Sequence, residues 1–167
     1  MMEKHTVSVL VENQAGVLSR VVGLFSRRGF NIDSLSVGTT ADENISRITI
    51  EVIGDEQIVE QVGKQLSKLI DVIKIKTLKE NETVKRGLML CKVKTTPKTR
   101  TEVMEIANVF RAKIVDISPS TLTIEMTGNE SKLDAFIEMI RPFGIEEISR
   151  TGMTALERGS NILKVDK

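Results

Sequence analysis

The chain of 167 residues has one cysteine, one histidine, no tryptophan and no tyrosine. A single cysteine cannot form an internal disulfide or a paired-cysteine metal site, and a single histidine cannot form a multi-histidine metal site. Any Ser/His/Asp or Cys/His mechanism would depend on His5, which lies close to the start of the chain. We therefore expect neither of these catalytic arrangements and no such metal site in this chain.

The sequence also lacks an excess of one charge. It has 24 Lys and Arg against 23 Asp and Glu, for a formal net charge of +1, and its only aromatic residues are five Phe. Nucleic-acid binding depends on basic patches and, for single strands, on aromatic side chains against which bases stack. A nucleic-acid partner is therefore not expected.

Long apolar runs are absent too. No stretch approaches the roughly 18 apolar residues that a membrane-spanning helix needs, and residues 1–11 show neither the apolar core nor the cleavage site of a secretory signal. These features predict a cytoplasmic protein without a membrane partner.

What is present is hydrophobic periodicity, which changes repeatedly between the strand and helix patterns. Alternating residues 6–11 predict a strand, and Leu18, Val21, Val22 and Phe25 predict one apolar helix face that ends at Gly29. Asp55 is a natural N-cap for a second helix. The remaining strands of the first half are expected at residues 31–38, 45–53 and 72–78.

The same order returns in the second half. Thr96 followed by Pro97 predicts a helix N-terminus with proline at the first helical position, and Asn129 repeats the capping role of Asp55. Strands are expected at residues 88–93, 113–117, 121–127 and 145–148.

Two βαββαβ halves predict an α+β protein with two tandem ferredoxin-like units. We assign residues 1–79 to the first unit, 80–85 to a linker, 86–150 to the second unit and 151–167 to a weakly patterned tail. Each unit would cover one face of its sheet with helices and leave the other face and the edges open. Such surfaces favour association, so an oligomer is expected.

The segment between the first strand and the first helix is the candidate binding site. Helix N-termini present free backbone N–H groups, so those of Gly16, Val17 and Leu18 could bind a carboxylate. Asn13 could add polar contacts to a bound amine or carboxylate. On the residues alone, an Asx turn at Asn13 and a loop glycine at Gly16 are the favoured interpretation of the segment.

The run Val9–Arg20 resembles the opening of an ACT domain, and Val21–Leu35 closely resembles the small regulatory subunit of acetolactate synthase, also called acetohydroxyacid synthase. Further matches cover nearly the whole chain, and the second unit resembles that family's ACT-like C-terminal domain. They lie at residues 46–50, 54–56, 64–72, 89–92, 116–120 and 132–141.

This resemblance implies a regulatory subunit without activity of its own. The family's separate catalytic subunit uses thiamin diphosphate, FAD and Mg²⁺, and the small subunit activates it and confers feedback inhibition by branched-chain amino acids, chiefly valine. The effector would lie where two ACT domains meet in a homodimer. Asn13, Gly16, Val17 and Leu18 would come from one protomer, and Asn31 and Ile32 from the other. The alternative is an amino-acid-sensing ACT protein that regulates a different enzyme.

Other residues suggest less specific roles. Arg20, Arg27 and Arg28 are expected on a solvated helix face, and Cys91 is expected to be a buried core thiol. A small phosphatase on the same scaffold would need an arginine in the loop before the first helix, and residues 12–16 contain none.

Overall fold

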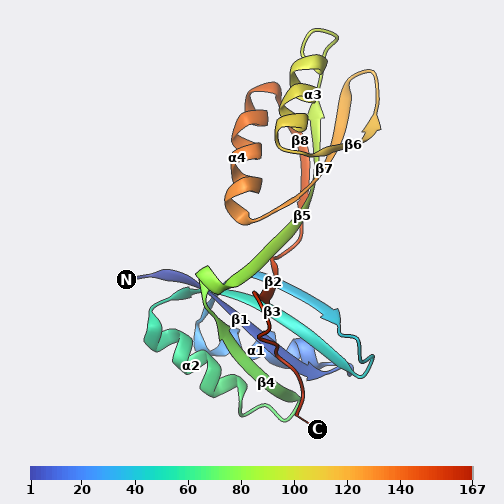
Figure 1. The fold of residues 1–167 in the computed structure, drawn as a ribbon. Coiled ribbons are helices and arrows are strands. Elements are labelled where there is room, and N and C mark those ends of the chain that lie inside the picture. The colour runs from blue at the N-terminus through green and yellow to red at the C-terminus, as the bar shows by residue number, and fades with distance from the viewer. Residues whose placement is uncertain (167) are drawn as a thin grey trace. The chain divides into compact units, whose positions relative to one another are not determined.

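The computed structural model describes residues 1–166, which divide into two compact units (Figure 1). The first unit comprises residues 1–84 together with the chain from residue 153 onward, and the second comprises residues 85–152. The final stretch of the chain thus belongs to the first unit. No helix among the described residues is long and apolar enough to cross a membrane.

The first unit has the predicted βαββαβ order. Its antiparallel sheet has the strand order β2-β3-β1-β4, so β2 and β4 are the edge strands. The elements are β1 (Glu3–Glu12), α1 (Val17–Arg28), β2 (Asn31–Thr39), β3 (Ile45–Gly54), α2 (Glu56–Leu66) and β4 (Val72–Leu78).

The second unit repeats this order, with a sheet in which β6, β7, β5 and β8 follow one another and β9 pairs with β5. Both units therefore have the expected ferredoxin-like fold. The short helix η1 (Glu80–Glu82) precedes β5 (Thr83–Lys94), α3 (Arg100–Val109), β6 (Lys113–Ile117), β7 (Thr121–Gly128), α4 (Glu130–Ile140), η2 (Arg141–Phe143), β8 (Ile145–Arg150) and β9 (Thr154–Glu157).

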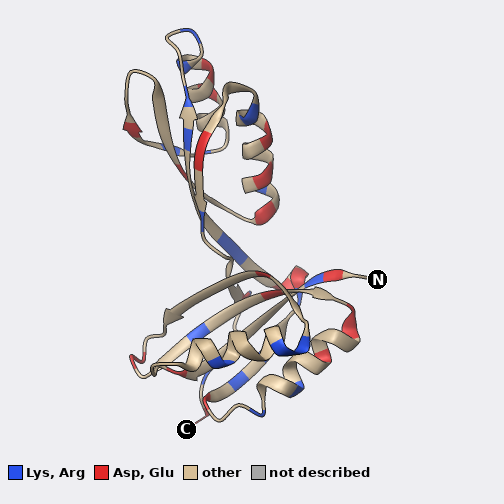
Figure 2. Ribbon diagram, turned by 180° about the vertical axis from the view of Figure 1, so that it is seen from behind, with Lys and Arg blue, Asp and Glu red and all other residues tan. Residues whose placement is uncertain are grey.

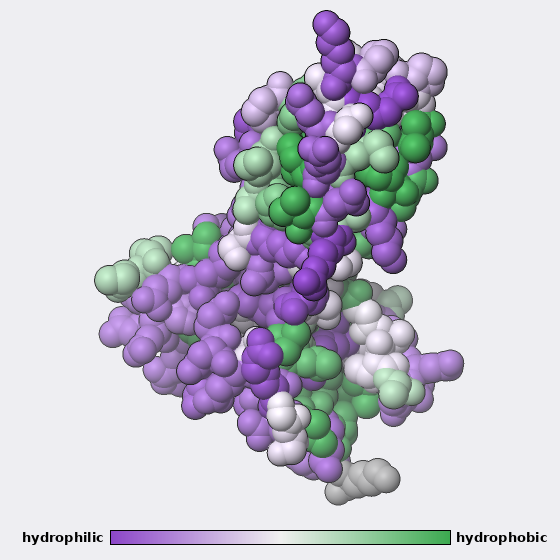
Figure 3. Space-filling model, turned by 45° about the horizontal axis from the view of Figure 1, so that its top comes forward, coloured by the Kyte–Doolittle hydropathy of each residue, from purple (hydrophilic) through white to green (hydrophobic). Residues whose placement is uncertain are grey.

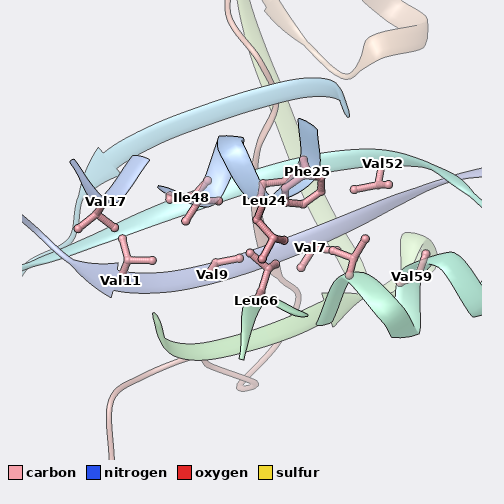
Figure 4. Close-up of a cluster of buried hydrophobic side chains, with 13 residues drawn as sticks. Val7, Val9, Val11, Val17, Leu24, Phe25, Ile48, Val52, Val59 and Leu66 are labelled. Atoms are coloured by element: carbon pink, nitrogen blue, oxygen red, sulfur yellow. The ribbon is translucent and has the colours of Figure 1, made fainter. Parts of the chain in front are cut away.

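The core of the first unit lies between its two helices and one face of its sheet (Figure 4). Alternation along β1 directs Val7, Val9 and Val11 to this face. The rings of Phe25 and Phe30 meet edge to face, with centroids 5.9 Å apart. The predicted inward residues of β3, which are Ile48, Ile50 and Val52, are all buried.

Both expected Asx caps are confirmed. The Asp55 carboxylate accepts from the Ile58 N–H at 2.9 Å, and the Asn129 amide oxygen accepts from the Lys132 N–H at 2.9 Å. Thr96 also caps a turn, because its hydroxyl accepts from the Thr99 N–H at 3.2 Å. The prediction that Pro97 opens the helix was wrong: residues 97–99 form a turn and α3 begins at Arg100.

The predicted buried face of α1 was partly wrong. Leu18 and Val22 are 41% and 36% exposed, whereas Val17, Val21, Leu24 and Phe25 are buried. The buried stripe is therefore rotated from the one that the sequence suggested. Leu18 and Val22, one turn apart, form an exposed apolar strip on α1.

The sheet of the first unit is not open on its outer face, contrary to the sequence-based expectation. Residues 153–166, which we call the C-terminal segment, run along this face (Figure 1). Met153 donates its N–H to the Ser34 hydroxyl at 3.2 Å, and Lys76 pairs with Glu157 at 2.8 Å. Outward-facing residues of the sheet are consequently buried, among them Thr6, Ser8, Leu10 and Thr49.

Cys91 is fully buried on β5, as expected for a core thiol. Burial raises the pKa of its thiol to about 11, which suppresses the reactive thiolate. We predict that a thiol reagent at pH 8 modifies folded protein at least roughly a hundred times more slowly than urea-unfolded protein. The absorbance change on reaction with a disulfide reagent measures both rates. Equal rates would contradict the conclusion that Cys91 is buried.

Candidate functional site

The N-terminus of α1 has free hydrogen-bond donors. Gly16 is its N-cap residue, with φ 85° and ψ −9°, and no side chain caps the helix. Within the described chain, the N–H groups of Gly16, Leu18 and Ser19 have no acceptor. A helix N-terminus with unsatisfied N–H groups and a left-handed glycine beside it can accommodate a carboxylate.

A guanidinium lies beside this helix N-terminus. Arg20 folds back so closely that a Cβ at Gly16 would lie 3.0 Å from its Nη1. Its Nε donates to the Asp71 carboxylate at 2.6 Å, and this hydrogen bond raises the pKa of Arg20. Charged residues of α1 are all basic (Figure 2). The site therefore has a fixed positive charge in addition to the helix dipole.

Arg20 lies on an exposed helix face, as expected, with 49% of its side chain accessible, but sequence reasoning did not assign it to the site. Its side chain pairs with Asp71, which lies 51 positions away and is mostly buried. Arg28 is also anchored, since its Nη2 donates to the Gln65 amide oxygen at 3.0 Å. The only available signal was that position 20 lies one turn after Gly16, on the same side of the helix as the free N–H groups.

Asn13 is held by the loop between β2 and β3. Its backbone N–H donates to the Asn44 carbonyl at 2.8 Å, and its side-chain Nδ2 donates to the Glu43 carbonyl at 2.8 Å. These bonds orient the amide and leave its Oδ1 as an acceptor. The side chain is thus held by a distant loop rather than by a local Asx turn.

The other site residues have different environments. Val17 is buried in the core and its N–H donates to the Gln14 carbonyl at 3.4 Å, so the prediction of a free N–H at this residue was wrong, whereas the exposed Leu18 can offer both its N–H and its side chain. Asn31 and Ile32 lie beyond the opposite end of α1, which at 12 residues is about 18 Å long. One chain therefore brings Asn13, Gly16, Val17 and Leu18 together but not Asn31 and Ile32.

This arrangement defines a class of protein: an ACT domain followed by a second, ACT-like unit of the same topology. Residues 7–74 match the family model for the AHAS small subunit-like ACT domain, and residues 86–159 match the model for the small subunit of acetolactate synthase. The chain belongs to the acetolactate synthase small-subunit family.

Relatives span the full chain. A probable acetolactate synthase small subunit of Archaeoglobus fulgidus is 54% identical over 94% of this chain and 98% of its own length. The acetolactate synthase isozyme 3 small subunit of Escherichia coli is 44% identical over 96% and 99%. The crystal structure of the acetolactate synthase small subunit from Thermotoga maritima matches with a TM-score of 0.89 and 39% identity, over 95% and 99% of the two chains.

Proposed function

We propose that this chain activates an acetolactate synthase catalytic subunit and makes it sensitive to valine bound at a homodimer interface of ACT domains. The observation that carries the proposal is the α1 N-terminus, where free N–H groups, Arg20 and Asn13 converge in a chain of this family. The thiamin diphosphate, Mg²⁺ and FAD of the synthase reaction belong to the catalytic partner, and effector binding requires none of them.

Strand register supports a site shared between two copies. β2 is an edge strand without proline, so it is free to pair with β2 of a second copy. Antiparallel pairing about its midpoint, Leu35, would place Asn31 of the second copy opposite Thr39. Thr39 pairs with Ser46, and Ser46 pairs with Val11, two residues before Asn13. The symmetric dimer would thus bring Asn31 and Ile32 to the Asn13 site.

The chemistry of this composite site suits an aliphatic amino acid. The effector carboxylate would accept from the N–H groups of Gly16, Leu18 and Ser19 near the Arg20 charge. The ammonium would donate to the free Oδ1 of Asn13. The aliphatic side chain would pack against exposed Leu18 and against Ile32 of the second copy, which supply apolar surface.

Replacing Asn13 by alanine tests this assignment. We expect Asn13→Ala to abolish valine inhibition of the reconstituted synthase and to leave activation by this chain intact, because the amide contacts the effector and lies on the surface. Asn44→Ala is the matched control: it removes an amide from the adjoining loop, where the side chain bonds only Asp42 among residues 1–166. Synthase assays with and without valine measure both properties.

The site assignment requires that a substitution at Asn13 abolishes valine inhibition without abolishing activation of the synthase. If folded Asn13→Ala loses activation along with valine inhibition, the effector site is wrongly placed. Titration calorimetry of the isolated chain with valine, leucine and isoleucine provides an independent measurement. An absence of heat with all three, together with no effect on a cognate synthase, would contradict the proposal as a whole.

A further inference from the structure

A cavity lies in the first unit, between the outer face of its sheet and the C-terminal segment. Its volume is about 790 Å³, within the usual range of small-molecule sites. Leu10 and Leu78 of the sheet line it on one side, and Ile162, Leu163 and Val165 of the segment line it on the other. Figure 3 shows hydrophobic surface on this unit among hydrophilic surroundings. The cavity is thus apolar and separate from the α1 N-terminus.

One cation of this mostly apolar lining has no ion pair within the described residues. Arg47 of β3 lines the cavity, and its Nε is shielded from solvent without a hydrogen-bond partner in residues 1–166. Burial lowers the pKa of Arg47, an effect that the nearby Glu157 carboxylate offsets only in part. Burying part of a guanidinium is costly, and an anion bound to its remaining, accessible nitrogens would offset part of that cost.

Two of the three acidic residues of the lining have lysine partners, and the third, Asp42, accepts within residues 1–166 only from the backbone N–H and side-chain Nδ2 of Asn44, at 2.9 and 3.2 Å. Glu157 pairs with Lys76 at 2.8 Å and Asp166 pairs with Lys74 at 3.1 Å, and neither lysine lines the cavity. Lys164, which does line it, has no ion pair within the described chain, as is also true of Arg47. The Asp42 carboxylate can balance only one of these two cations, so the lining keeps one positive charge for an anion.

From this combination we infer a ligand site for an aliphatic carboxylate, with its headgroup on Arg47 and its chain between Leu10, Leu78 and Ile162. A guanidinium presents a planar fork that matches the two oxygens of a carboxylate. The ligand would join the sheet to the C-terminal segment, because its two walls come from these two parts of the chain. This inference does not depend on the valine site.

Titration calorimetry with octanoate, octyl phosphate and octanol tests the site on the full chain. We expect octanoate to bind the wild type more tightly than either of the others. Arg47→Gln is expected to weaken octanoate about tenfold or more and to leave octanol unchanged. Ile162→Asp should abolish octanoate binding, because it places a charge in the cavity lining. Ile70→Asp is the control and should not affect binding, because Ile70 lies outside the cavity. Both positions are exposed, by 67% and 96% respectively.

Tryptic cleavage gives a second readout. Octanoate should slow cleavage after Arg158 and Lys164 in the wild type but not in Arg47→Gln, because the bound ligand holds the segment to the sheet. Asn13→Ala should bind octanoate normally, which separates this site from the valine site. Equal affinity for octanoate and octanol, tighter binding of octyl phosphate, or unchanged octanoate affinity in Arg47→Gln would each overturn the inference.

Discussion

Gly16→Ala is expected to weaken valine binding at least about tenfold, while Gly29→Ala leaves it unchanged. The two glycines flank the same helix, and both have left-handed backbone conformations, with φ 85° and 69°. Alanine in this conformation costs roughly 1–2 kcal/mol at either position. The free energy of unfolding should therefore fall by similar amounts in the two variants.

The surroundings of the two glycines differ. A Cβ at position 16 would lie 3.0 Å from the Arg20 Nη1, whereas a Cβ at position 29 would meet nothing within 4 Å. Only Gly16→Ala therefore displaces the guanidinium and narrows the approach to the free N–H groups of α1. Calorimetric titration with valine and urea unfolding measure the two effects separately. Equal loss of valine affinity in both variants would show that backbone strain, rather than the ligand approach, controls binding.

Secondary structure was readable from the sequence because each element carries its own local signals. Periodicity and caps are properties of neighbouring residues, so the strands of the first unit and the caps at Asp55 and Asn129 were predicted correctly. The prediction from Thr96 and Pro97 was only partly correct. The cap at Thr96 forms, but the chain completes a turn before regular helix begins at Arg100.

Contacts between distant parts of the chain could not be predicted from the sequence. Leu18 and Val22 are exposed because of the way α1 packs on its sheet. Helical spacing alone is compatible with both the predicted and the observed buried face. The Arg20–Asp71 pair joins residues 51 positions apart. The C-terminal segment contains apolar residues such as Ile162 but is weakly patterned, and its place on the sheet depends on partners such as Ser34 and Lys76.

The candidate site shows the same division. The helix N-terminus and the Asn13 amide were proposed from local sequence, and the resemblance supplied Asn31 and Ile32. The structure adds that α1 separates these two groups within one chain, so a site that contains both would need two copies. It also adds Arg20, whose position beside Gly16 follows from its pairing with Asp71.

Val22→Asp should dissociate the proposed homodimer and, with it, the valine site. Val22 belongs to the exposed apolar strip of α1. Neither residue of this strip is part of the hydrophobic core of the first unit. In a symmetric dimer each substitution occurs twice, and an unpaired carboxylate buried in the interface is strongly unfavourable. We expect the dimer dissociation constant to rise at least about a hundredfold. Sedimentation velocity measures this change.

Ile70→Asp is the matched control, because it places the same charge at a position that is 96% exposed. Circular dichroism must show that both variants fold. In the proposed shared site, Asn31 and Ile32 come from the second copy, so monomeric Val22→Asp should lose valine binding. Raising the protein concentration should restore part of this binding by mass action. A folded monomer with full valine affinity would contradict the shared site. An unchanged dimer would instead show that α1 lies outside the interface.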